Sequence, residues 1–215
     1  MKIEAFIITN GRSTFKYALK SLENQDVDIK ITILENLIWV NALNKCLELC
    51  KSPFYLRVDD DMFLHPSCIR YMLLQAKKAK KLGVYACSLW EDWSHRPGGY
   101  IKLYKTKVAK KITFRANKLG KVDKPFFKDL SKTKYKLIKD KSLVGLHACG
   151  TLDDEDQYRQ LWLKQNAKVH YNEPSNLDIA RKKYKKTIVQ QYELMKQLVG
   201  KNKKYKTKFY GFISK

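Results

Sequence analysis

The sequence predicts an α/β protein with a doubly wound, mostly parallel, Rossmann-like sheet and a helical, basic C-terminal extension. The first observation is that strand-like and helix-like segments alternate through the first 90 residues. The second is a strand that closes in three consecutive aspartates. The third is a cationic excess confined to the later part of the chain. Alternating strands and helices fold as right-handed crossovers, which make neighbouring strands parallel.

The first two predicted strands are separated by a helix. Residues 3–8 form a β-branched, aromatic run that stops at the turn signal of residues 9–11. Residues 28–34 alternate apolar and polar side chains, as a half-buried strand does. Between them, over residues 14–25, apolar side chains recur at helical spacing. These side chains are Phe15, Ala18, Leu19 and Leu22.

The same alternation continues downstream. A helix is predicted over residues 40–51, a Ser52-Pro53 break follows, and residues 54–58 form the third strand. A helix over 66–81 and strands over 84–89 and 142–146 come next. The last predicted helix spans 177–199, where apolar side chains form a stripe at helical spacing and lysines concentrate in the first turns. The stripe consists of Ile179, Ala180, Tyr184, Ile188, Tyr192, Met195 and Val199.

Asp59, Asp60 and Asp61 close the third strand. In open α/β sheets, ligands bind at the carboxyl ends of the strands. Adjacent like charges repel one another, so such a cluster is easiest to keep ionised beside a cation, and carboxylates suit Mg²⁺ and Mn²⁺. The alternative is a solvated acidic turn, or an N-cap for the helix after Pro66.

The net charge of +23 is unevenly distributed. Residues 1–65 hold 8 Lys/Arg against 9 Asp/Glu, residues 102–141 hold 15 against 3, and residues 181–215 hold 12 against 1. A basic surface of this kind can bind nucleic acid, anionic lipid headgroups or an anionic acceptor. The alternative is a lysine-rich composition that only keeps the protein soluble.

Cysteine content and hydropathy indicate the compartment. Five scattered cysteines without a Cys-x-x-Cys pair argue against a disulfide framework and against a zinc site. No apolar run approaches the roughly 20 residues of a transmembrane helix, and no targeting segment is expected. We therefore expect a cytoplasmic protein. Its basic, aromatic tail, residues 201–215, would allow peripheral contact with an anionic membrane.

Three blocks of sequence resemble the opening of the family 2 glycosyltransferases, which have the GT-A fold. They are Ile8-Thr9-Asn10-Gly11-Arg12, residues 19–25 and residues 31–36. Asn44 then stands at the family's distance before a strand ending in Asp-x-Asp. The resemblance covers roughly residues 2–90. It implies a nucleotide-sugar-binding half at 1–90, an acceptor-side half at 91–175, and a basic amphipathic helix and tail at 176–215.

The resemblance also implies roles for individual residues. The metal would be Mn²⁺ or Mg²⁺, with Asp61 as its direct ligand and Asp59 beside it. The family usually continues Asp-x-Gly-Ser-Thr-Asp after the second strand, whereas this chain has Glu35-Asn36-Leu37-Ile38-Trp39. This shorter loop leaves the donor base open. The residues expected to contact the donor are Thr9, Asn10, Arg12, Glu35, Asn44, Asp59 and Asp60.

A second acidic segment, residues 151–159, resembles the family's acceptor-side motif, in which one carboxylate is the general base. Asp156 and Asp154 are both candidates for the base, and Glu155 lies between them. An inverting transfer needs this carboxylate within hydrogen-bond reach of the acceptor hydroxyl. The alternative is a helix N-cap, a role that does not exclude catalysis.

The remaining candidates are histidines and an aromatic loop. His147 or His170 would complete the metal site, although a lone histidine is more often structural. In the Trp- and Gly-rich segment 91–100, Trp93, Asp92 and Arg96 could bind the acceptor sugar. The alternative for this segment is a hairpin turn.

Together these features predict a metal-dependent glycosyltransferase. It would move a sugar from a nucleoside-diphosphate donor to a glycan or lipid-linked saccharide, with inversion. One alternative is a nucleotidyltransferase, but no Gly-rich phosphate loop follows the first strand. The other is a basic nucleic-acid-binding protein, for which we find no helix-turn-helix, zinc-finger or RNA-recognition motif.

Overall fold

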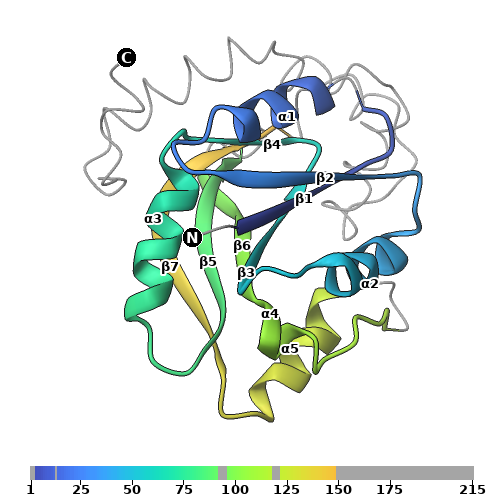
Figure 1. The fold of residues 1–215 in the computed structure, drawn as a ribbon, viewed down its shortest axis with the longest axis vertical. Helices are drawn as coiled ribbons and strands as arrows, with labels where there is room; N and C mark the ends of the chain where they lie inside the picture. Colours follow the sequence, from blue (N-terminus) through green and yellow to red (C-terminus); the bar gives the residue numbers. More distant parts are fainter. Residues whose placement is uncertain (1–2, 13, 92–95, 118–121, 149–215) are drawn as a thin grey trace, which may run out of the picture.

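The computed structural model describes residues 3–12, 14–91, 96–117 and 122–148 (Figure 1). The helix predicted over 177–199, and with it the helical C-terminal extension, lies outside these residues. No helix of the described part of the chain is long and apolar enough to cross a membrane.

In the described part of the chain, seven strands form one mixed sheet in the order β2-β1-β3-β6-β5-β7-β4. The pairs β1–β2, β1–β3 and β5–β7 are parallel, whereas β6 is antiparallel to both β3 and β5, and β4 is antiparallel to β7. The strands are β1 (Ile3–Thr9), β2 (Ile29–Glu35), β3 (Phe54–Asp59), β4 (Met62–Leu64), β5 (Leu82–Glu91), β6 (Arg96–Lys105) and β7 (Lys136–His147).

Helices cover both faces of the sheet (Figure 1). One apolar cluster joins α1 and α3 to one face, and a second joins α2, α4 and α5 to the other. The helices are α1 (Phe15–Glu23), α2 (Trp39–Leu49), α3 (Cys68–Lys78), α4 (Thr106–Ala109) and α5 (Asp123–Ser131). This is the layered α/β architecture that the sequence predicted.

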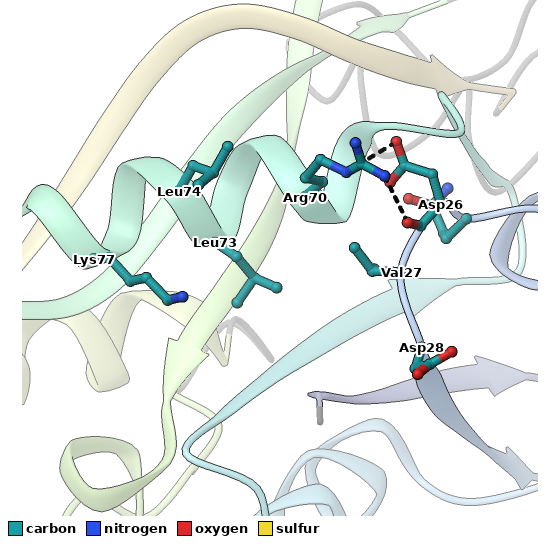
Figure 2. Close-up of a pocket in the computed structure, with 8 residues that line it drawn as sticks. Asp26, Val27, Asp28, Arg70, Leu73, Leu74 and Lys77 are labelled. Carbon is teal, nitrogen blue, oxygen red and sulfur yellow. Dashed lines mark hydrogen bonds and ion pairs between the residues drawn. The ribbon is translucent and has the colours of Figure 1, made fainter. Parts of the chain in front are cut away.

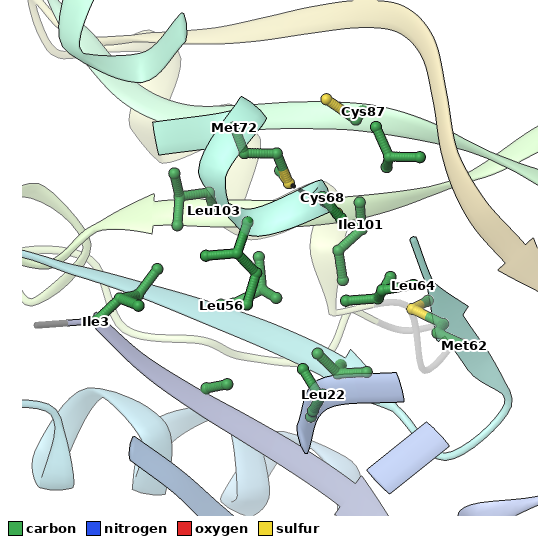
Figure 3. Close-up of a cluster of buried hydrophobic side chains, with 14 of the residues drawn as sticks. Ile3, Leu22, Leu56, Met62, Leu64, Cys68, Met72, Cys87, Ile101 and Leu103 are labelled. Atoms are coloured by element: carbon green, nitrogen blue, oxygen red, sulfur yellow. Dashed lines mark hydrogen bonds between the residues drawn. The ribbon is translucent and has the colours of Figure 1, made fainter. Parts of the chain in front are cut away.

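Strand β1 lies between the two apolar clusters and is buried along its whole length. Ala5 and Ile7 pack into the cluster under α1 and α3, while Phe6 and Ile8 pack into the cluster under α2. Figure 3 shows the first cluster, with Ile3 of β1 beside Leu56. Side chains of a strand alternate between the faces of a sheet, so a strand covered on both sides is apolar wherever its side chains have no polar partner. The buried Glu4 is the exception in residues 3–8, and its Oε1 accepts from the amides of Lys51 and Ser52 at 3.0 Å each.

The predicted elements of the first 90 residues are confirmed, with bounds that shift by a few residues. Four further elements, β4, β6, α4 and α5, were not predicted, and β7 begins six residues before the strand expected at 142–146. The two strands that flank the centre of the segment 91–100, β5 and β6, pair antiparallel with Glu91 opposite Arg96. The connecting residues 92–95 lie outside the described part of the chain, so both interpretations of the segment stay predictions.

The topology brings three strand ends to one edge of the sheet. Strand β6 reverses direction between β3 and β5, so β3, β5 and β7 all run the same way. Their carboxyl ends are Asp59, Glu91 and His147. The short strand β4 folds back onto β7, where a Cβ at Gly145 would lie 2.3 Å from the Phe63 carbonyl oxygen. Only glycine therefore permits this approach, which holds the aspartate turn against β7.

Asn44 joins α2 to the segment before α5. Its Nδ2 donates to the Phe114 carbonyl (2.9 Å) and its Oδ1 accepts from the Phe114 amide (3.0 Å). Asn44→Ala leaves the amide and the carbonyl of the buried Phe114 without these partners. We therefore expect the substitution to lower the free energy of unfolding by about 1–3 kcal/mol. Urea titration measures this, with the exposed Asn41→Ala as the control. Equal stability of the two variants would contradict the assignment.

Candidate active site

Asp60 and Asp61 form the turn between β3 and β4, and each is only 4% exposed. Burying a carboxylate is costly unless hydrogen bonds or opposite charges compensate. Here the compensation comes from the loop after β1, which lies beside β3 because the two strands are parallel neighbours with Ile8 opposite Asp59. Strand pairing therefore places the loop of residues 9–12 against the two aspartates.

Asp60 is held by the first residues of that loop. Its Oδ2 accepts from Thr9 Oγ1 (2.7 Å) and, at 3.3 Å, from the Asn10 amide. Thr9 Oγ1 in turn accepts from the amide of Gly11 (2.9 Å), whose φ of +81° is in the left-handed region that glycine tolerates. Burial raises the pKa of Asp60, and the Thr9 hydroxyl and Arg12 act against that rise.

Asp61 lies between two basic side chains. Arg12 Nη1 donates to its Oδ2 at 2.7 Å and also lies 3.5 Å from Asp60 Oδ1. On the other side, His147 Nε2 lies 3.4 Å from Asp61 Oδ1. Burial on its own would raise the pKa of Asp61, but His147 and Arg12 lower it to about 2. The carboxylate is therefore charged at neutral pH.

His147 is flanked by a second carboxylate that the sequence did not identify as a site residue. Glu91 Oε1 lies 3.9 Å from His147 Nδ1 and accepts from the Gly99 amide at 2.7 Å. A Cβ at Gly99 would stand 2.9 Å from His147 Nδ1, so a larger residue here would displace the imidazole. The rule that strand ends carry ligand-binding groups, applied to β5 as it was to β3, would have found Glu91.

The pair of Asp61 and His147 fits a divalent cation. Asp61 Oδ1 is buried and lies 3.4 Å from His147 Nε2, close enough for the two atoms to bind one cation. Within the described ranges, no three His, Cys, Asp or Glu side chains group into a complete metal site. Mg²⁺ and Mn²⁺ do not require one, because they usually bind one or two carboxylates together with substrate phosphates and water.

The other predicted donor residues are distributed along the same edge or behind it. Glu35 is exposed at the end of β2, directly opposite Thr9. Asp59 contacts Arg57, with 3.5 Å between Oδ1 and Nε. Asn44 is engaged by the Phe114 backbone. The structure thus brings Thr9, Asn10, Arg12, Asp60, Asp61 and His147 together. It gives Asn44 a structural partner, and its contact with a donor stays a prediction.

Several predicted site residues cannot be placed. The backbone of Arg96 begins β6 opposite Glu91. The acceptor candidates Asp92 and Trp93, the base candidates Asp154, Glu155 and Asp156, and the alternative metal ligand His170 lie outside the described residues. Their roles stay predictions.

A groove of about 530 Å³ lies away from these residues, between α3 and the loop that enters β2 (Figure 2). Arg70 crosses its rim and pairs with Asp26, with 3.3 Å between Nε and Oδ2. Asp28, in its wall, precedes the first residue of β2, so the groove is at the amino edge of that strand. None of the predicted site residues lines this groove.

Solved structures define the class of fold. A mannosyltransferase from Pyrobaculum calidifontis, determined with GDP-Man and Mn²⁺, matches with a TM-score of 0.56 and 12% identity, over 92% of this chain and 73% of that one. S. aureus TarS 1–349 in complex with UDP matches with a TM-score of 0.51 and 12% identity, over 93% and 71%. The fold is therefore that of GT-A glycosyltransferases.

The family follows from the sequence itself. The model of glycosyl transferase family 2 matches residues 2–135, which is more than half of the chain. The protein belongs to glycosyl transferase family 2 and is a glycosyltransferase. No curated protein sequence matches it closely enough to count as a relative.

Because the pKa of Asp61 is low, its contribution to the free energy of unfolding should depend on pH. A carboxyl whose pKa falls from about 3.9 unfolded to about 2 folded stabilises the fold by about 2–3 kcal/mol above pH 4, and this contribution disappears as pH falls toward 2. Asp61→Asn should therefore cost more stability at pH 6 than at pH 2.5, measured by urea unfolding. Asp28→Asn, at an exposed site, is the control. A pH-independent difference would contradict the account.

Proposed function

We propose that this glycosyltransferase uses a nucleoside-diphosphate sugar and a divalent metal, Mn²⁺ or Mg²⁺, and transfers the sugar with inversion to a hydroxyl of a glycan or lipid-linked saccharide. The observation that carries the proposal is the buried Asp60–Asp61 turn with Arg12 and His147 at the carboxyl edge. A diphosphate binds cationic groups such as Arg12, and a divalent metal binds carboxylates such as Asp61. Both kinds of group lie together at this edge of the sheet. Membership of family 2 favours glycosyl transfer over nucleotidyl transfer.

The neighbouring structures support the donor class. One was determined with GDP-Man and Mn²⁺, and the other with UDP. We propose that a nucleoside diphosphate lies across the ends of β2, β1 and β3 here as well. From Glu35 to Thr9 to Asp60 this path crosses two strand spacings, about 10 Å. The base would lie at the Glu35 end and the diphosphate at the Asp61 end.

In the proposed reaction, the acceptor hydroxyl oxygen bonds to the anomeric carbon while the bond from that carbon to the diphosphate oxygen breaks. Asp156 or Asp154 would take the hydroxyl proton. Arg12 would turn from Asp61 toward the departing diphosphate, to which a guanidinium donates well. Glu91 would keep the His147 imidazole oriented toward Asp61.

Asp61 and His147 would hold the metal, and Asp59 is a further candidate. A bound divalent cation would neutralise negative charge that develops on the leaving diphosphate. Asp60, which bonds to Thr9, would shape the loop after β1 around the donor. We further propose that the protein is cytoplasmic, and that the basic tail at 201–215 contacts an anionic membrane surface.

Thermal-shift measurements test donor and metal together. Wild type is heated with UDP, GDP, CDP or dTDP, each with and without Mn²⁺. Ligand at a hundredfold excess over Kd stabilises the native state by about 2.7 kcal/mol, which corresponds to several degrees in Tm. We expect a metal-dependent rise for at least one nucleotide, and its loss in Asp61→Ala but not in the control Asp28→Ala. No rise with any nucleotide would sink the proposal.

The carboxylate of Glu35 predicts which nucleotide base the protein prefers. An ionised carboxylate only accepts hydrogen bonds, so it suits guanine and uracil, whose ring N–H donates. Cytosine offers it only the exocyclic amino group, beside a bare ring nitrogen that repels a carboxylate. Wild type should bind UDP or GDP more tightly than CDP. Glu35→Ala should raise the Kd of the preferred nucleotide about tenfold and change that of CDP less.

Isothermal titration calorimetry measures these constants. Glu23→Ala, which removes an exposed carboxylate at the end of α1, is the matched control. A Glu35→Ala variant that keeps the wild-type order of affinities would show that Glu35 does not select the base.

A further inference from the structure

Three consecutive large apolar side chains are exposed where β2 meets α2. Leu37 is 37% exposed, Ile38 72% and Trp39 38%. Single exposed apolar residues are common on folded proteins, but a contiguous group marks a surface that binds something. We call residues 37–39 the apolar ledge. It occupies the place of the longer polar loop that the family usually has after the second strand.

The apolar ledge is fixed beside the proposed donor site. The amide of Asn36 donates to the Thr9 carbonyl (3.2 Å), and Asn36 takes a left-handed φ of +53° that turns the chain at this point. The carbonyl of Ile38 then accepts from the amide of Ala42 (3.0 Å), which starts α2. The loop therefore has little freedom, and it adjoins the same Thr9 that bonds to Asp60.

The ring of Trp39 packs against Arg57, which ion pairs hold in place. The guanidinium carbon of Arg57 lies 5.0 Å from the centre of its ring. Arg57, in β3, is 5% exposed and held by Asp123 (Nη1–Oδ1 3.3 Å) and Asp59 (Nε–Oδ1 3.5 Å). An indole stacked on a fixed cation loses little freedom when a ligand covers it, so binding costs less entropy.

The occupant follows from what lies next to the ledge. Arg12 and Asp61, which could bind phosphate and a metal, lie together at the β3–β4 turn. The ledge follows the end of β2, and it offers an aromatic ring and aliphatic side chains. A ligand that is apolar and planar at one end and anionic at the other fits both. Resting on the proposed function, we infer that Trp39 is the platform on which the base of the donor nucleotide stacks.

If Trp39 binds the base, a substitution there should weaken the binding of nucleotides but not that of a diphosphate without a base. Trp39→Ala should raise the Kd of UDP and GDP, measured with Mn²⁺, about tenfold to a hundredfold, the usual effect of losing one base–aromatic stack. Pyrophosphate, which has no base, should bind the variant as it binds wild type. Trp39→Phe keeps an aromatic ring and should retain most of the affinity. Leu49→Ala removes an exposed apolar side chain at the other end of α2 and is the control.

Calorimetry gives the constants, and tryptophan fluorescence gives a second readout. UDP should quench the emission of wild type more than that of Trp39→Phe, because the substitution removes the tryptophan on which the base would stack. Unchanged nucleotide affinity in a folded Trp39→Ala would overturn the inference. So would a change of oligomeric state or Tm without a change in affinity, because the ledge would then cover a protein surface. Wild type that binds pyrophosphate but no nucleotide contradicts it too, whereas no binding of either contradicts the proposed function itself.

Discussion

The burial of two adjacent carboxylates at the end of β3 is the constraint on which the rest of the site depends. Asp60 and Asp61 are almost inaccessible to water, so each needs partners from elsewhere in the chain. The Thr9 hydroxyl donates a hydrogen bond to Asp60, and Arg12 and His147 lie against the carboxylate of Asp61. These partners come from β1 and β7, which only the completed sheet brings to β3. Assembly of the site is therefore inseparable from folding.

Two directional features of the sheet produce this convergence. Parallel pairing of β1 with β3 puts the loop of residues 9–12 beside the aspartates, and the reversal in β6 brings the carboxyl ends of β5 and β7 to the same edge. Glycines at 99 and 145 then let the backbone approach where a side chain would collide. On the outer side, Arg57 supports Trp39 at the end of the shortened loop. The edge thus has a charged part and an aromatic part.

Local pattern was sufficient to predict the first three strands, the first two helices and the aspartate turn, because each depends on residues close in sequence. It failed where local signals conflict with the fold. Residues 96–99 carry a proline and two glycines, which argue against a strand, yet β6 is held in place by β3 and β5. The contacts of Asp61 with Arg12 and His147 span 49 and 86 residues, so no local rule reveals them. Glu91 was missed for a different reason, because the strand-end rule that identified the aspartates was not applied to β5.

Release of nucleoside diphosphate from sugar nucleotides tests the central claim most directly. UDP- and GDP-sugars are incubated with the full chain and Mn²⁺, first with water as acceptor, and the free nucleotide is quantified for wild type and Asp61→Asn. The account predicts metal-dependent turnover of a particular donor by wild type, lowered at least a hundredfold in the variant, which should still fold. Equal turnover by the two proteins, or none by wild type with any donor, would contradict the assignment of this edge as the active site.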